Sequence, residues 1–237
     1  MQRYFIESED RLIFSSEQIR HMTRVMRMKP RDRFEAVYRG KCYVMEIRSL
    51  EPFCADIVEE LSVSTELEKD LTLLYCLPKG EKLDLVIQKA TEIGVRRIIL
   101  VESSRCVCRY KAGDFERKYP RLKKIAVEAS EQSRRLCVPE ISGVIPFSDI
   151  GKLKFDRAYI AYENERTKRI DIDSTETVNS IGILIGSEGG FSKEEALFAE
   201  ASGYWPVSLG KRILRSETAC FYALSVLAYL LENADEV

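Results

Sequence analysis

From residue 71 onward, continuous apolar runs alternate with segments that have the apolar spacing of helices. The apolar runs are residues 71–77, 97–101, 157–162, 181–185 and 205–209. The helical segments between them include residues 80–94, which Gly94 is suited to end, and the basic stretch 115–136. Strands without polar alternation are typical of parallel sheets covered by helices on both faces. The sequence therefore predicts an α/β fold with a mostly parallel sheet.

The first 66 residues have a different pattern, typical of a small strand-rich unit. Its expected elements are a helix at residues 16–26, a hairpin of strands at 34–38 and 42–47, and a further strand at 55–61. Arg39-Gly40-Lys41 suits the hairpin turn, and Ser15 or Ser16 suits the helix cap. The polar residues 62–70 are expected to form a linker. We therefore expect an N-terminal domain at residues 1–68 and a second domain at residues 71–237.

Two glycine-bearing loops each follow an apolar run and precede a helical segment. One is Ile185-Gly186-Ser187-Glu188-Gly189-Gly190-Phe191-Ser192, and the other begins at Leu209-Gly210 and continues through Arg212-Ile213-Leu214-Arg215 to Glu217-Thr218. Ligands of parallel sheets bind beyond the carboxyl ends of the strands, so the loops are expected to form two walls of one pocket. A tight turn without a ligand would have the same glycines. Neither loop has the pattern of a phosphate loop or a dinucleotide fingerprint, which disfavours a nucleotide-phosphate hydrolase.

The second loop carries charged side chains close to the expected end of the sheet. Arg212, Arg215 and Glu217 are candidates for chemistry because of that position. The alternative is a structural one, in which the two arginines pair with carboxylates such as Glu188 and Glu217. Ser192 and Glu195 form a capping box that starts the helix after the first loop.

Basic side chains gather in two parts of a chain whose formal net charge is −1. Residues 18–41 hold eight basic side chains against two acidic ones, and residues 105–135 hold ten against four. Two such regions favour a localised polyanion-binding face, although solvated helix faces would have the same composition. In the helix at residues 16–26, the spacing places Arg20, Arg24 and Arg27 together on the polar side.

Several classes of protein are disfavoured. Seven scattered cysteines without paired spacing, and His21 as the sole histidine, favour reduced free thiols and no metal site. The chain has no apolar run long enough to span a bilayer, and its first residues lack the order of a signal peptide. We expect no membrane association and a cytoplasmic location. Residues 219–231 are apolar on nearly every side, so we expect a helix covered by the core and by a partner subunit.

The two loops together resemble the signature of the SPOUT methyltransferases, and in particular the RsmE type, which methylates N3 of uracil in small-subunit ribosomal RNA. The matching stretches are Ile185 to Glu195, Leu209 to Ala219, Gln88-Lys89-Ala90-Thr91-Glu92-Ile93-Gly94-Val95, Glu131-Gln132-Ser133-x-Arg135 with Val138-Pro139, Arg3-Tyr4-Phe5, and His21-x-x-x-Val25-x-Arg27. The sequence departs from the family at Ser187, where proline is usual, at Arg134, and at Arg31. None of these departures removes a residue assigned to chemistry.

The resemblance implies a C-terminal SPOUT domain with a deep trefoil knot, an N-terminal PUA-like RNA-binding β-barrel, and a homodimer. It also implies methylation of uracil-1498 of 16S rRNA, within the assembled small subunit, with S-adenosylmethionine as methyl donor. The alternatives are a SPOUT enzyme for another RNA target, such as a transfer RNA ribose 2′-hydroxyl, and a non-catalytic RNA-binding relative.

Site residues follow from the matched motifs. The expected cofactor-binding residues are Gly186, Glu188, Gly189, Gly190, Leu209, Gly210, Ile213, Leu214 and Thr218. The expected RNA-binding residues are Arg3, His21, Arg24, Arg27 and Arg135. Loss of the N3 proton leaves negative charge on O2 and O4 of uracil, which a cationic donor would stabilise. Arg215 is the leading candidate for that donor, with Arg212 and Arg135 behind it, and Glu217 either accepts a proton or orients an arginine.

Overall fold

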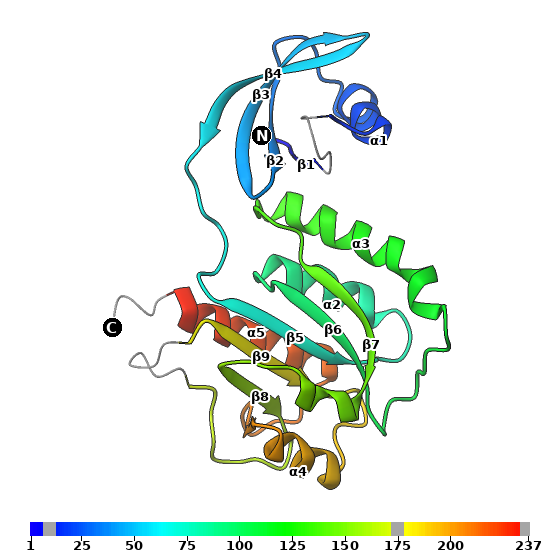
Figure 1. The fold of residues 1–237 in the computed structure, drawn as a ribbon, viewed down its shortest axis with the longest axis vertical. Coiled ribbons are helices and arrows are strands. Elements are labelled where there is room, and N and C mark those ends of the chain that lie inside the picture. Colours follow the sequence, from blue (N-terminus) through cyan, green and yellow to red (C-terminus); the bar gives the residue numbers. More distant parts are fainter. Residues whose placement is uncertain (7–12, 172–177, 233–237) are drawn as a thin grey trace. The chain divides into compact units, whose positions relative to one another are not determined.

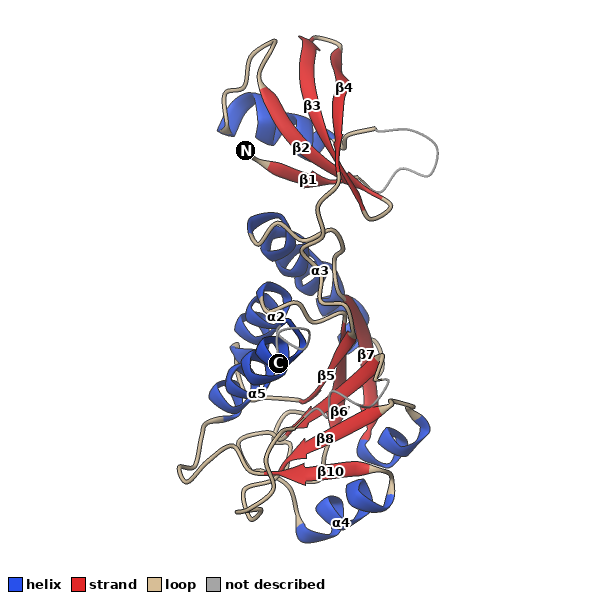
Figure 2. Ribbon diagram, turned by 90° about the vertical axis from the view of Figure 1, so that its left-hand side faces the viewer, coloured by secondary structure: helices blue, strands red, loops and turns tan. Residues whose placement is uncertain are grey.

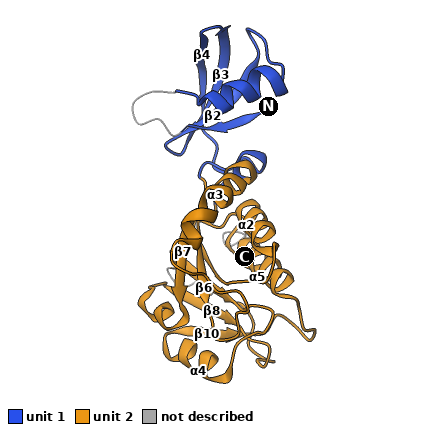
Figure 3. Ribbon diagram, turned by 90° about the vertical axis from the view of Figure 1, so that its right-hand side faces the viewer, with its two compact units in different colours: residues 1–66, 130–137 blue, residues 67–129, 138–237 orange. Residues whose placement is uncertain are grey.

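The computed structural model describes residues 1–6, 13–171 and 178–232. The chain divides into two compact units (Figure 3). Unit 1 contains Met1–Glu66 together with Ser130–Cys137, and unit 2 contains Leu67–Ala129 and Val138–Val237. A short segment from the middle of the chain therefore belongs to the N-terminal unit.

Unit 1 is a four-stranded mixed sheet with one helical segment (Figure 1). Its strands, in spatial order, are β1 (Arg3–Phe5), β2 (Arg33–Tyr38), β3 (Lys41–Leu50) and β4 (Phe53–Leu61). β1 runs parallel to β2, and the other pairs are antiparallel. The predicted hairpin is confirmed: Arg39 and Gly40 connect β2 and β3, with φ of 49° and 75°, as a tight hairpin turn requires. The three-residue β1 was not predicted, because so short a run has no readable alternation.

The predicted N-terminal helix is also confirmed, except that Arg27, expected on its polar side with Arg20 and Arg24, lies beyond its end with a left-handed φ of 53°. α1 (Ser16–Arg20) is capped by Ser15, whose side chain accepts a hydrogen bond from the Gln18 N–H, and it continues into a π-helix, η1 (His21–Val25). The core of unit 1 gathers Tyr4, Ile6, Phe14, Met22, Phe34, Ala36, Met45 and Ile47.

Unit 2 is a six-stranded sheet in which every neighbouring pair is parallel, as predicted. The spatial order of its strands is β10 (Tyr204–Val207), β8 (Arg157–Ala161), β9 (Ser180–Ile185), β5 (Asp70–Cys76), β6 (Arg97–Glu102) and β7 (Glu140–Pro146). Its helices are α2 (Lys82–Glu92), α3 (Asp114–Gln132), the 3₁₀ helix η2 (Phe147–Lys152), α4 (Lys193–Ala201) and α5 (Ser216–Glu232). The last turn of α3 belongs to unit 1.

Helices cover both faces of this sheet, which explains its apolar strands. Figure 2 shows α2 and α5 on one side of the sheet and α4 on the other. The central strand β5 is buried from Leu71 to Cys76. Gly94 ends α2 with φ of 103°, as predicted from its position. Among the described helices, none combines the length and apolar character needed to cross a membrane.

Two expectations about the middle of the chain were wrong or incomplete. The helix expected at residues 115–136 ends at Gln132, and Arg134 adopts a left-handed φ of 61° that a helix does not allow. β7 and η2 were not predicted, because β7 has a glycine and largely half-buried side chains instead of a continuous apolar run.

Candidate functional site

A cavity of about 540 Å³ opens at the carboxyl ends of three neighbouring strands of unit 2. Its walls are the loops that follow β8, β9 and β10, together with Lys82 at the start of α2. Small-molecule sites in proteins have volumes of about 300 to 1,000 Å³. The predicted meeting of the two glycine-bearing loops around one pocket is therefore confirmed.

The glycines of the loop after β9 lie close to neighbouring atoms, which leave little room for a side chain. A Cβ on Gly189 would lie 3.0 Å from Cβ of Arg105, and a Cβ on Gly186 would lie 3.2 Å from the Phe191 ring. Gly190 has φ of 63° and closes a turn through its N–H, which donates to the Ser187 carbonyl. The glycines therefore fix the shape of this wall as well as leaving its backbone open.

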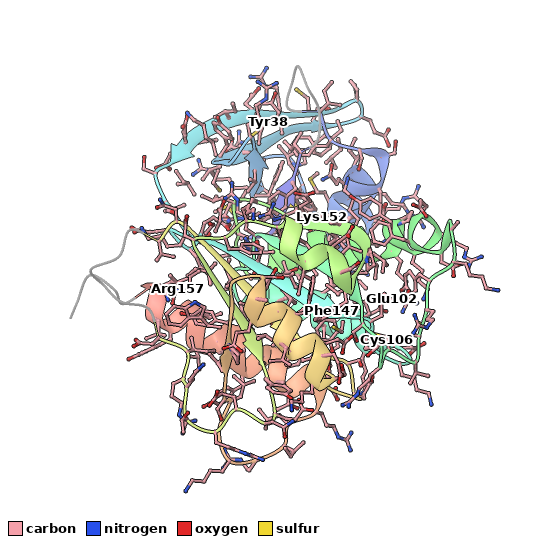
Figure 4. The ribbon with its side chains drawn as sticks, turned by 60° about the horizontal axis from the view of Figure 1, so that its bottom comes forward. Tyr38, Glu102, Cys106, Phe147, Lys152 and Arg157 are labelled. Carbon is pink, nitrogen blue, oxygen red and sulfur yellow. The ribbon has the colours of Figure 1, made fainter. Side chains whose placement is uncertain are left out.

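The segment that follows β6 forms hydrogen bonds with the loop after β9. The Arg105 guanidinium donates to the Gly189 carbonyl at 3.0 Å, and the Ser187 hydroxyl donates to the Arg105 carbonyl at 3.3 Å. Cys106, labelled in Figure 4, is buried in the same segment and shares a hydrogen bond with the Ser103 hydroxyl. The capping box that starts α4 is confirmed, and its Glu195 also accepts a hydrogen bond from the Ser104 N–H.

The loop after β10 is tied to its two neighbours. The Ser208 N–H donates to the carbonyl of Lys168, in the loop after β8. At the other end, the hydroxyl of Ser216 lies 2.5 Å from the Gly186 carbonyl oxygen and 2.9 Å from the Tyr75 hydroxyl. Gly210 has φ of 111°, a conformation that other residues rarely adopt. These bonds hold the second wall against the first.

Lys82 occupies a position at the cavity that the sequence analysis missed. Its ammonium nitrogen lies 3.0 Å from Glu188 and 3.1 Å from Glu217, so one cation joins the two loop motifs. Burial raises the pKa of each carboxyl, but hydrogen bonds from its own backbone N–H and from Lys82 outweigh burial, and the net pKa of both is lowered. The lowered pKa makes Glu217 a weaker base than a free glutamate. The sequence feature that could have indicated Lys82 is its position in the segment that follows the carboxyl end of β5.

Arg212 and Arg215 both line the cavity and are exposed. Across residues 1–6, 13–171 and 178–232, no carboxylate lies within ion-pair distance of either guanidinium. Glu188 and Glu217 form their ion pairs with Lys82 and not with these arginines, although the charge of Arg215 also helps to lower the pKa of Glu217. The two guanidinium groups are left facing the cavity and the solvent.

Most of the expected cofactor residues meet at this cavity. Those lining it are Gly186, Glu188, Gly189, Gly190, Leu209, Gly210, Ile213 and Leu214. Thr218 does not line it and is exposed on the first turn of α5. Glu217 does not line the cavity itself but forms an ion pair with Lys82, which does.

The loop after β8 was not predicted to contribute, yet it forms the third wall through Tyr162, Glu163, Glu165 and Arg166. The Glu165 carboxylate accepts hydrogen bonds from the N–H groups of Thr167, Lys168 and Arg166, and these lower its pKa to about 2. The sequence feature that could have indicated this wall is again its position, because the loop follows the carboxyl end of β8. No cluster of candidate metal ligands occurs within the described part of the chain.

The expected RNA-binding residues fall into two groups in unit 1. Arg24 and Arg27 are exposed, and neither has an ion pair with any residue that the structure describes. His21 is half-buried, with Nδ1 2.8 Å from the Tyr4 hydroxyl.

Arg3 and Arg135 require a correction. Arg3 is 3% exposed, pairs with Glu35 at 2.8 Å and donates to the Arg135 carbonyl. Arg135 is 2% exposed and pairs with Glu66 at 2.5 Å. Because both guanidinium groups are buried against carboxylates, we assign them to the structure of unit 1 and no longer to RNA binding or to uracil.

Comparisons with known proteins identify the family. The RNA methyltransferase domain family matches residues 65–228. The ribosomal RNA small subunit methyltransferase E of Bacillus subtilis is 32% identical over 98% of both chains, and that of Mesomycoplasma hyopneumoniae is 30% identical over 95% of this chain and 98% of its own. This chain belongs to the ribosomal RNA small subunit methyltransferase E family. The family resemblance stated from the sequence is thus confirmed.

Solved structures agree with this assignment. A crystal structure of a ribosomal RNA small subunit methyltransferase E from Neisseria gonorrhoeae, bound to S-adenosyl methionine, has a TM-score of 0.85 and 27% identity, covering 97% of this chain and 98% of its own. A putative methyltransferase from Legionella pneumophila, in complex with the same cofactor, has a TM-score of 0.85 and 27% identity, covering 96% of both chains. Likeness along nearly the whole length includes both units.

Proposed function

We propose that the protein transfers a methyl group from S-adenosylmethionine to N3 of one uracil in 16S ribosomal RNA, at the family's position, uracil-1498. The observation that carries this proposal is the pair of guanidinium groups at the cavity, Arg212 and Arg215, which the described carboxylates leave without ion pairs. A guanidinium group outside an ion pair keeps its N–H donors available for negative charge on a ligand. Family membership supports the same reaction.

The cavity suits S-adenosylmethionine. Apolar side chains for an adenine ring come from Ile185, Leu209, Ile213 and Leu214, and the glycines leave backbone groups open to a ring edge. The carboxylate of Glu188 suits a molecule that carries ammonium and sulfonium charges. When bound, S-adenosylmethionine supplies an electrophilic methyl group.

The residues of this chain then act on the uracil. Arg215, with Arg212 lining the same cavity, donates hydrogen bonds to O2 or O4, where negative charge collects when the N3 proton passes to water and the methyl group bonds to N3 in its place. Glu217 forms an ion pair with Lys82, which supports an orienting role. The loops hold N3 in line with the methyl group, and this positioning supplies a further part of the rate.

Three finer structural features belong to this proposal: a knot, an N-terminal barrel and a homodimer. Residues 71–237 form the SPOUT domain, and its loops after β8, β9 and β10 form a deep trefoil knot; the bonds from Ser208 to Lys168 and from Ser216 to Gly186 support such interlocking. Residues 1–68 form a PUA-like RNA-binding barrel, supported by the strands of unit 1 and the exposed Arg24 and Arg27. The reaction takes place in the cytoplasm on the assembled small subunit.

A homodimer is the third part of the proposal. One side of α5 packs against α2 and β9, while Tyr222 and Tyr229 are 48% and 68% exposed. A partner subunit would cover these aromatic rings. Light scattering on the purified protein should give twice the chain mass, and a monomer at micromolar concentration would contradict this part.

The decisive experiment is to map the product. Purified small ribosomal subunits and naked 16S rRNA are each incubated with the protein and labelled S-adenosylmethionine, and the methylated nucleotide is located by mass spectrometry. N3-methyluridine at a single position is expected, with the assembled subunit as the better substrate. Methyl transfer to a ribose 2′-hydroxyl, or binding of RNA without transfer, would favour the alternatives.

A further inference from the structure

Glu163 is a cavity-lining carboxylate to which neither the loop structure nor the methyl transfer assigns a role. Of the three glutamates that line the cavity in the described chain, Glu165 is bonded to backbone N–H groups and Glu188 to Lys82 and the Lys79 N–H. Glu163 is half-buried, and the described residues offer its carboxylate no hydrogen-bond donor. Its oxygens are therefore available to accept hydrogen bonds from a ligand in the cavity.

The chain clears space for this carboxylate. A Cβ on Gly190 would lie 2.6 Å from one Glu163 oxygen and 3.0 Å from the other. Glycine at this position therefore serves two purposes, since it adopts φ of 63° and lets the Glu163 carboxylate lie directly against the backbone of the cofactor loop. The acid is thus held at the wall where a nucleoside would lie.

The position of Glu163 in the sheet indicates which ligand groups could donate hydrogen bonds to it. Glu163 follows β8, the parallel neighbour of β9, and β9 carries the glycine-bearing loop. In dinucleotide-binding sheets, the glycine loop follows one strand and an acid near the end of a neighbouring strand accepts hydrogen bonds from ribose hydroxyls. A carboxylate has two oxygens, and a ribose presents two neighbouring hydroxyl donors, so the chemistry matches in a bidentate way.

We propose that the Glu163 carboxylate accepts hydrogen bonds from the 2′- and 3′-hydroxyls of the methyl donor's ribose. Glu163 is thereby a positioning and specificity residue that selects ribonucleosides over deoxyribonucleosides. This inference rests on the proposed function, because it assumes that the cavity holds S-adenosylmethionine.

The test is a double-mutant cycle measured by calorimetry, with binding as its readout. The wild-type protein and Glu163→Gln are titrated with S-adenosylhomocysteine and with its 2′-deoxy analogue. In the wild type, the missing hydroxyl should weaken binding about tenfold or more, because a hydrogen bond to a charged group is lost. In Glu163→Gln, the two ligands should bind almost equally.

Glu194→Gln is the matched control, because it removes the same charge from an exposed side chain of α4 that does not line the cavity. It should keep the wild-type preference for the ribose form. A wild-type preference retained in Glu163→Gln would overturn the inference. If only S-adenosylmethionine, and not S-adenosylhomocysteine, lost affinity in Glu163→Gln, the carboxylate would face the sulfonium charge and the diol contact would be wrong. A wild-type protein that binds neither ligand would refute the proposed function itself.

Discussion

Arginines of the two units are held in opposite ways. In unit 1, Arg3 and Arg135 are buried and paired with Glu35 and Glu66. In unit 2, Arg212 and Arg215 are exposed at the cavity, and the nearby carboxylates are bonded to Lys82 instead. The motif resemblance treated all four arginines as candidates for RNA or catalysis. The structure separates them by their counter-ions: a paired buried arginine stabilises the unit, and one without an internal partner is available to a substrate.

The largest effect is expected at the cavity. Arg215→Ala should reduce methyl transfer by about 10²- to 10³-fold, because the charge developing on the uracil loses its donor. S-adenosylmethionine affinity, measured by calorimetry, should remain near that of the wild type. Lys211→Ala is the matched control, since Lys211 is exposed beside Arg212 but does not line the cavity. Full transfer activity in Arg215→Ala would exclude Arg215 as the donor.

The next effect is expected in unit 1 and concerns stability. Glu66→Gln should lower the free energy of unfolding by about 3 kcal/mol, because Arg135 loses its buried counter-ion. Scanning calorimetry would detect the loss, while the fluorescence of Trp205, the single tryptophan, reports on unit 2. A variant as stable as the wild type would show that the ion pair is not structural.

This stability difference should depend on pH. Burial raises the pKa of Glu66, but the hydrogen bonds from Arg135, Cys137 and the Leu136 N–H outweigh it and lower the pKa below the usual 4.5. A lowered folded-state pKa stabilises the fold above pH 4.5, and this contribution disappears as the pH falls through the folded-state pKa. The gap between wild type and Glu66→Gln should therefore narrow below pH 4.5.

A smaller effect is expected from the glycine that faces Glu163. Gly190→Ala should weaken S-adenosylmethionine binding about tenfold, because the left-handed φ and the contact with the carboxylate both become unfavourable. Gly203→Ala is the control, because Gly203 also has a positive φ, of 91°, but nothing lies within 4 Å of its added Cβ. Equal cofactor affinities in the two variants would show that the contact between Gly190 and Glu163 does not affect cofactor binding.

The smallest effect is expected on RNA affinity. Replacing Arg24 and Arg27 together with Gln should weaken RNA binding several-fold and reduce its salt dependence by about 1.5 in log-log slope. Replacing Arg33 and Lys41 with Gln removes the same charge from side chains that already pair with Glu46 and Glu60. This control variant should change RNA affinity less than the Arg24 and Arg27 variant does. If it weakened RNA binding more, the RNA-binding surface would lie on the β2–β3 hairpin instead.

Local patterns predicted the elements with strong periodicity. The strands around Leu71, Ile98 and Ile183 were readable because both of their faces are buried, and the Ser192 cap was readable from Glu195 three residues later. The strand at Glu140–Pro146 was not, because its side chains are mostly half-buried and it contains a glycine.

Long-range pairing was outside what a sequence pattern can show. Glu66 and Arg135 are 69 residues apart, and Lys82 reaches Glu188 and Glu217 from a different helix. The glycine motifs therefore indicated where the cavity lies, but the choice of counter-ions depends on which strands become neighbours. The pairing of Lys82 with both carboxylates leaves Arg212 and Arg215 outside ion pairs at the cavity.

The most direct test of this division measures two properties on the same two variants. Methyl transfer to small subunits and the unfolding midpoint are determined for Arg215→Ala and Glu66→Gln beside the wild type. The account predicts a crossed pattern, in which Arg215→Ala keeps its midpoint and loses transfer, while Glu66→Gln loses stability and keeps transfer at temperatures where it is folded. A fully folded Glu66→Gln without activity, or an Arg215→Ala that is inactive only because it unfolds, would contradict it.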